Sequence, residues 1–264
     1  VIGNITGKAA SGHITVACKS YNVGIPSAFK TQSIKVKAPE RQNVVEFTYE
    51  PGEDVPLWDE FQPAMLRLTL NLETKAGDEQ FSDQRSVNFG MRDSAKERNR
   101  LKINGRSVFL RGKNDCCLFP LTGYPPMDKV GWLRVLSIAK FYGINHYRFH
   151  SWCPPEAAFG AADELGVYFQ AEIPNKRSGF RAPEDREAAI HNIDRLDVKS
   201  SLKKVSLYEY AKREAELIFK AFGNHPSFVM FTLGNELGRN EGMFDMVAHF
   251  KEIDPRHLYA QGSN

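Results

Sequence analysis

The chain has 264 residues, enough for one large domain or two modest ones, and its content of 42% hydrophobic and 25% charged residues is typical of a folded globular protein. No apolar run approaches the roughly 20 residues that a membrane-spanning helix needs, and 35 basic residues nearly balance 32 acidic ones, for a net charge of +3. These features exclude a membrane-spanning protein, and we expect neither a membrane nor a nucleic acid among its partners.

The four cysteines predict neither a metal site nor a disulfide framework. Cys116 and Cys117 are adjacent, which makes a bridge between them awkward, and Cys18 and Cys153 form no CxxC pair. The first 16 residues lack the basic and then apolar pattern of a signal peptide, so the chain either has none or has lost it. The cellular location therefore stays open.

Residues 1–95 show short runs in which apolar and polar side chains alternate. Examples are 13–17, 44–49 and the longest run, 65–72, with glycine and proline residues between them. This period of two is typical of half-buried strands, and it predicts a small antiparallel β-sandwich. No cluster of side chains in this half suggests chemistry, which favours a supporting role.

After the polar stretch 92–100, short apolar segments alternate with longer amphipathic ones. We expect strands at 108–111, 144–149, 167–172, 228–233 and 258–261, and helices at 128–142, 155–165, 203–222 and 241–252. Repeated β-α units predict a parallel sheet, so the chain is divided into domains at 1–95 and 96–264. The long polar segment 174–202 follows the third of these strands and is expected at the active face.

Glu236 is the strongest candidate for a catalytic residue. It follows the apolar strand 228–233 and the pair Gly234-Asn235, which places its carboxylate at the carboxyl end of that strand. Barrel enzymes keep their catalytic groups there. The alternative is an exposed glutamate that caps the next helix, and position alone does not separate the two.

The strand at 144–149 and the loop after it form a second candidate region. Arg148 and His150 share one face of the strand, and an inward arginine needs a carboxylate partner. His150 is either a core histidine or a metal ligand, and the lack of a second histidine at ligand spacing favours the first. Trp152 is either a platform for sugar stacking or part of the core.

A family resemblance rests on several segments taken in chain order. They are 109–112, 120–128, the loop at Arg148, 162–168, Glu172, and 224–227 leading into 234–236. Together they resemble glycoside hydrolase family 2, which includes β-galactosidases, β-glucuronidases and β-mannosidases. Residues 57–66 and 89–92 resemble parts of the immunoglobulin-like domain of that family, so the resemblance covers most of residues 55–264.

The resemblance implies an immunoglobulin-like β-sandwich followed by about five strands of a (β/α)8 TIM barrel, and a retaining exo-β-glycosidase that acts on terminal β-linked sugars by double displacement. Glu236 would be the acid/base, Asn235 would bind the 2-hydroxyl group of the substrate, and Arg148 and Glu172 would support the site. A carbohydrate is therefore the expected partner, with a β-galactoside favoured because that activity is common in the family. Glucuronide and mannoside substrates also fit, and the chemistry requires no cofactor.

The sequence departs from the family pattern in three places. A His-Glu pair after strand one is replaced by Cys116-Cys117, preceded by Asp115, which joins His150 and Trp152 as a candidate for substrate binding. A histidine three residues after Arg148 is replaced by Ser151, so the sugar specificity stays open. The family's nucleophile is a glutamate on strand seven, whereas this chain ends after the fifth expected strand. We therefore expect a fragment of a longer enzyme that is inactive alone and self-associates through open barrel edges.

A function of a different class also fits the sequence. A non-catalytic carbohydrate-binding protein could recognise glycans in a groove at the barrel mouth without cleaving them. A glutamate at the end of strand seven in the downstream sequence would favour the enzyme over the binding protein.

Overall fold

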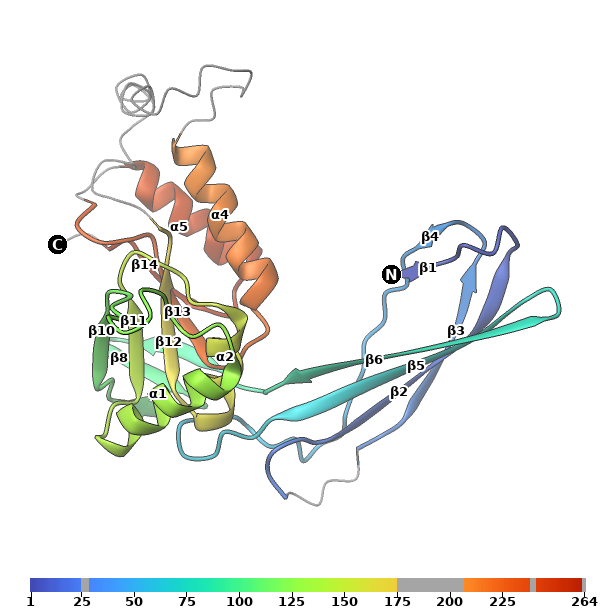
Figure 1. The fold of residues 1–264 in the computed structure, drawn as a ribbon, viewed down its shortest axis with the longest axis horizontal. Coiled ribbons are helices and arrows are strands. Elements are labelled where there is room, and N and C mark those ends of the chain that lie inside the picture. Colours follow the sequence, from blue (N-terminus) through green and yellow to red (C-terminus); the bar gives the residue numbers. More distant parts are fainter. Residues whose placement is uncertain (25–28, 175–206, 238–240, 263–264) are drawn as a thin grey trace. The chain divides into compact units, whose positions relative to one another are not determined.

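The structure is a computed structural model that describes residues 1–24, 29–174, 207–237 and 241–262. Contacts divide the chain into two compact units (Figure 1): residues 1–58 with 64–91, and residues 59–63 with 92–264. The first unit thus ends at Met91, close to the boundary predicted at residue 95, while residues 59–63 belong to the second unit. Most of the loop predicted at 174–202 lies outside the described residues.

The first unit is built on one antiparallel sheet in the order β3-β2-β5-β6. Its strands are β2 (Ala10–Ser20), β3 (Gln32–Ala38), β5 (Leu66–Ala76) and β6 (Glu79–Phe89), and a separate ladder joins β1 (Ile2–Gly3) to β4 (Gln42–Asn43). Ile14, Val16 and Val36 are buried on one face of the large sheet. An immunoglobulin-like sandwich stays a prediction for this unit, because the described residues form one large sheet and a small ladder.

The run at 44–49 shows that alternation can predict burial without predicting a strand. Val45, Phe47 and Tyr49 pack against the buried cluster of the sheet, while the residues between them are exposed. The segment nevertheless joins no sheet. It covers the apolar face as an irregular layer.

The second unit begins with an antiparallel sheet that the sequence analysis did not predict. It contains β7 (Ser94–Glu97), β8 (Arg100–Ile103) and β9 (Arg106–Val108). Strand β7 lies within the polar stretch 92–100, where the domain boundary was predicted, and β8 begins at the last residue of that stretch. The first parallel strand is β10 (Gly112–Asp115), four residues after the strand expected at 108–111. The prediction was misled because β10 is a polar edge strand, whereas the apolar Phe109 is 77% exposed.

Five parallel strands in chain order form the main sheet, β10-β11-β12-β13-β14, which confirms the predicted parallel sheet. The other strands are β11 (His146–Phe149), β12 (Tyr168–Glu172), β13 (Phe228–Thr232) and β14 (Leu258–Ala260). The helices between them are α1 (Lys129–Phe141), α2 (Glu156–Leu165), α4 (Leu207–Phe222) and α5 (Glu241–Ile253), as Figure 1 shows. Strands that alternate with helices in this way form part of an α/β barrel.

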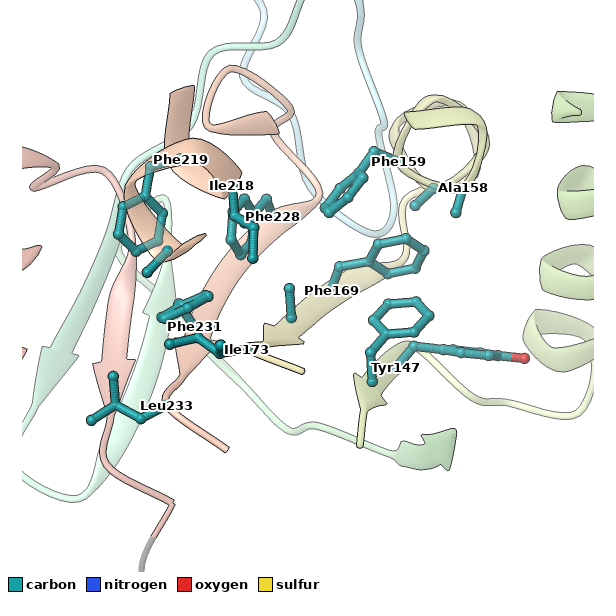
Figure 2. Packing of buried hydrophobic residues seen from close by; sticks show 14 of the residues in the cluster. Tyr147, Ala158, Phe159, Phe169, Ile173, Ile218, Phe219, Phe228, Phe231 and Leu233 are labelled. Atoms are coloured by element: carbon teal, nitrogen blue, oxygen red, sulfur yellow. The ribbon is translucent and has the colours of Figure 1, made fainter. Parts of the chain in front are cut away.

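Aromatic side chains fill the space between the strands and the helices. Figure 2 shows Phe159 of α2 and Phe169 of β12 in this core, where their ring centroids lie 5.4 Å apart. Phe149 of β11 meets Phe169 edge to face at 4.7 Å, and both rings are fully buried. Because side chains alternate along a strand, the residues between these aromatics face the other side of the sheet. The packing thus fixes the orientation of that inner face.

Residues 59–63 pack closely against the rest of the second unit. Asn145 Nδ2 donates a hydrogen bond to Glu60 Oε2 over 2.8 Å, and Lys140 Nζ donates to the Glu60 carbonyl oxygen over 2.8 Å. Gly166, which ends α2 with φ of +68°, approaches the same segment, and a Cβ there would lie 2.9 Å from the Glu60 Cα. This position therefore requires glycine both for its backbone conformation and for the space available.

Gly166→Ala should destabilise the chain more than Gly143→Ala. Gly143 also has a positive φ, +84°, but a Cβ there would have no neighbour within 4 Å. The left-handed conformation should cost about 1–2 kcal/mol in either variant, and the contact with Glu60 adds a further cost only at Gly166. Urea denaturation of both variants measures the difference, and equal losses would show that the close approach contributes nothing.

Candidate active site

Three of the predicted site residues meet at the carboxyl ends of β11, β12 and β13. Arg148 Nε donates a hydrogen bond to Glu172 Oε1 over 2.6 Å, and Arg148 Nη2 donates to Asn235 Oδ1 over 3.0 Å. Glu172 is therefore the carboxylate partner that an inward arginine was expected to need. The guanidinium group thus links β11 to the ends of β12 and β13.

Glu172 is held on both sides of its carboxylate. The Ser151 backbone N–H donates to Oε2 over 2.6 Å, while Arg148 occupies Oε1. The side chain has no solvent exposure. Ser151 adopts φ of +60°, a left-handed conformation that is uncommon for a residue other than glycine. The structure thus places Glu172 behind Arg148, away from any open surface.

Glu236 is an exposed residue just after β13, next to Asn235. Its φ is +53°, which is again left-handed. Such backbone conformations are concentrated at functional sites. Its other predicted role, as cap of the following helix, stays an alternative, because residues 238–240, which lead into α5, are outside the described residues.

Asp115, His150 and Trp152 lie at the ends of β10 and β11, and none of them bonds to the Arg148 side chain. Asp115 is 3% exposed, and its carboxylate accepts from Lys113 Nζ over 2.8 Å and from the Cys117 backbone N–H over 2.9 Å. The His150 backbone N–H and Trp152 Nε1 both donate to the Asp115 carbonyl oxygen. The substrate-binding role assigned to these three residues stays a prediction.

Trp152 is partly buried and packs against other aromatic rings. Its centroid lies 5.1 Å from that of Phe149 and 6.5 Å from that of Trp132. Together with the hydrogen bond from its Nε1, these contacts anchor the indole in the core. Of the two roles considered from the sequence, the packing favours the core.

The inner face of the sheet carries polar residues that the sequence analysis did not single out. Gln170, two residues before Glu172, donates from Nε2 to Thr232 Oγ1 over 2.5 Å. His146, two residues before Arg148, is 6% exposed. Polar residues at every second position of otherwise apolar strands are the signal that could have identified this face.

The described part of the chain shows no group of three His, Cys, Asp or Glu side chains placed to hold a metal ion. It likewise contains no helix that is long and apolar enough to cross a membrane.

Proteins of similar sequence are glycosidases. The family model of "Glycosyl hydrolases family 2, TIM barrel domain" matches residues 95–262. The β-galactosidase of Lactococcus lactis is 25% identical over 204 residues, which cover 76% of this chain and 19% of that enzyme. The β-galactosidase of Kluyveromyces lactis is 27% identical over 246 residues, which cover 88% of this chain and 21% of that enzyme. The chain thus spans about a fifth of the length of these curated relatives.

A solved structure of similar fold is the β-glucuronidase of Parabacteroides merdae. The TM-score is 0.69, over 96% of this chain and 29% of that chain, and the sequence identity is 20%. Similarity at this identity shows the fold alone. It agrees with the assignment of the parallel sheet to part of an α/β barrel.

His146 links the inner face to the stability of the protein. Burial, and to a smaller extent the neighbouring Arg148 charge, lowers its pKa from 6.5 to about 4. Within the described residues, its Nε2 has no hydrogen-bond partner. The unfolded chain therefore binds a proton at His146 more tightly than the folded chain does, so stability is lost as the pH falls from 6.5 towards 4.

Lowering the pH from about 7.5 to about 5 should reduce the free energy of unfolding by about 2 kcal/mol through His146 alone. In His146→Gln this contribution should vanish, although His257, whose pKa burial also lowers, keeps its own. Urea denaturation at both pH values measures the effect, with His13→Gln as a control at a half-exposed position in the first unit. The same pH dependence in wild type and His146→Gln would contradict this assignment.

Proposed function

This chain belongs to glycosyl hydrolase family 2, and on that premise we propose that it carries the acid/base part of the active site of a retaining exo-β-glycosidase. The observation that carries the proposal is the pair Asn235-Glu236 at the carboxyl end of β13, with Asn235 bonded to the Arg148–Glu172 ion pair. Catalytic groups of barrel enzymes lie at this end of the strands.

Glu236 fits the role of acid/base by its position and exposure. In a retaining mechanism, one carboxylic acid protonates the departing glycosidic oxygen and afterwards removes a proton from the attacking water. A second carboxylate, about 5 Å away, is the nucleophile. Glu172 does not suit that role, because it is fully buried and both of its oxygens are occupied. We place the nucleophile on another strand of the complete barrel.

The proposed substrate is a terminal β-linked sugar whose 2-hydroxyl group binds Asn235. A β-galactoside is favoured because both of the curated relatives described above are β-galactosidases. A β-glucuronide is the alternative suggested by the related solved structure, and a β-mannoside also fits the motifs. The sheet of the first unit is proposed to belong to an immunoglobulin-like sandwich that supports the barrel.

In the protein that contains this chain, Glu236→Gln should lower the hydrolysis rate of alkyl β-glycosides by about 100-fold or more, as expected for loss of a general acid. Nitrophenyl β-glycosides should lose much less in the glycosylation step, because a nitrophenolate departs without a proton. Since Glu236 also activates water, glycosyl-enzyme should accumulate with the nitrophenyl substrate. Added azide, which needs no base, should then release a β-glycosyl azide. Steady-state kinetics and product analysis measure both effects.

Glu216→Gln is the matched control, because this glutamate on α4 pairs with His249 and lies outside the proposed site. Its kinetics should match those of the wild type. Equal losses on both classes of leaving group, without rescue by azide, would show that Glu236 is not the acid/base. A wild-type protein that binds glycans but cleaves none would instead favour the carbohydrate-binding protein.

A further inference from the structure

Building on the proposed function, we propose that Glu172 is a positioning residue that acts through Arg148 to decide which end of the Asn235 amide faces the substrate. The ion pair and the amide form one chain of contacts across three strand ends: Glu172 Oε1 to Arg148 Nε at 2.6 Å, and Arg148 Nη2 to Asn235 Oδ1 at 3.0 Å. Glu172 itself does not touch the sugar.

Hydrogen-bond chemistry fixes the orientation of Asn235. A guanidinium group only donates hydrogen bonds, so the atom of Asn235 that meets Arg148 must be the carbonyl oxygen. The two N–H groups of Nδ2 are then directed elsewhere and can donate to a hydroxyl oxygen of the sugar. Without Arg148 in place, the amide could turn over and present its oxygen to the substrate instead.

Arg148 is itself held by Glu172. The guanidinium group is planar and rigid, so fixing its Nε edge also fixes the direction of Nη2. The carboxylate that fixes it is fully buried, and its other oxygen accepts from the Ser151 backbone N–H over 2.6 Å. Ser151 adopts a left-handed φ of +60° in the turn after β11, and in this conformation its N–H donates to the Glu172 carboxylate.

Only a carboxylate satisfies this arrangement, because donors approach it from both sides. Glutamine at position 172 would turn an NH2 group towards either Arg148 Nε or the Ser151 N–H, and in both cases a donor would face a donor. It would also leave the arginine without its counter-charge. Glu172→Gln should therefore release Arg148, and with it Asn235.

The test compares wild type, Glu172→Gln, Asn235→Ala and the double variant in the protein that contains this chain. The substrates are the nitrophenyl β-glycoside that the wild type hydrolyses fastest and its 2-deoxy counterpart, and the readout is the ratio of their kcat/KM values. A site that hydrogen-bonds a substrate hydroxyl discriminates against an analogue that lacks it. Glu172→Gln should lower this ratio by about 10-fold or more, because hydrogen bonds to the 2-hydroxyl strengthen in the transition state. The double variant should have the same ratio as Asn235→Ala.

Glu60→Gln is the matched control. Glu60 is also a buried glutamate in the second unit, and its carboxylate accepts from Asn145 and Arg111, but its bonds are to residues outside the Arg148 network. This variant should lose stability and keep the substrate ratio. Arg148→Lys is the second variant, in case Glu172→Gln does not fold. It keeps a positive charge near Glu172, lacks the fork that reaches Asn235, and should also lower the ratio.

The inference would be overturned if Glu172→Gln lost activity equally on both substrates, or if Arg148→Lys left the substrate ratio unchanged. It would also be overturned if the double variant discriminated less than Asn235→Ala, or if the wild type did not discriminate between the two substrates. Failure of the proposed function looks different, because the wild type would then hydrolyse neither substrate.

Discussion

A fully buried carboxylate, that of Glu172, organises the carboxyl edge of the parallel sheet. Burying an ionised carboxylate away from water raises the free energy of the folded state unless an opposite charge and hydrogen-bond donors replace the lost water. Arg148 and the Ser151 backbone N–H supply these. Arg148 must therefore lie on the inner face of β11, and Ser151 must turn its N–H inwards. Once Arg148 is held there, its Nη2 donates to the Asn235 side-chain oxygen. One desolvated group thereby fixes the ends of three strands.

The opposite face of the sheet makes this arrangement rigid. Tyr147 and Phe149 flank Arg148 along β11 and are buried against the helices, just as Ala171 and Ile173 flank Glu172. Because neighbours along a strand point to opposite faces, the tilt of each inner side chain is set by the packing of its outer neighbours. Functional groups on packed strands are held more precisely than groups on loops. The aromatic core is therefore part of what positions the site.

The sequence predicts the features that depend on burial and does not predict those that depend on the backbone. Periodicity located α1, α2 and α5 closely, because apolar residues recur along each of them at intervals of three and four residues. Periodicity did not locate β10, because this polar edge strand contains no apolar run. It also predicted a strand at 44–49, where alternate side chains are partly buried although the segment pairs with no strand. At the site, the need of Arg148 for a carboxylate could be inferred from its charge. The role of Ser151 could not be inferred from the sequence. Its backbone N–H, which binds Glu172, is present in every residue except proline, and a serine side chain does not indicate a left-handed φ.

Three residues with left-handed backbones, Cys117, Ser151 and Glu236, follow three strands that end at the same edge. Each conformation costs about 1–2 kcal/mol for a residue other than glycine, so the surrounding structure must offset it. The three residues differ in the group that the left-handed conformation makes available. The Cys117 and Ser151 N–H groups bind the buried carboxylates of Asp115 and Glu172, whereas Glu236 supplies a side chain that glycine does not have. At Cys117 and Ser151, glycine would relieve the strain and keep the same N–H, but at the cost of more conformational entropy on folding. At Glu236, glycine would likewise relieve the strain but would remove the carboxylate, which ties this left-handed conformation directly to the chemistry proposed for the residue.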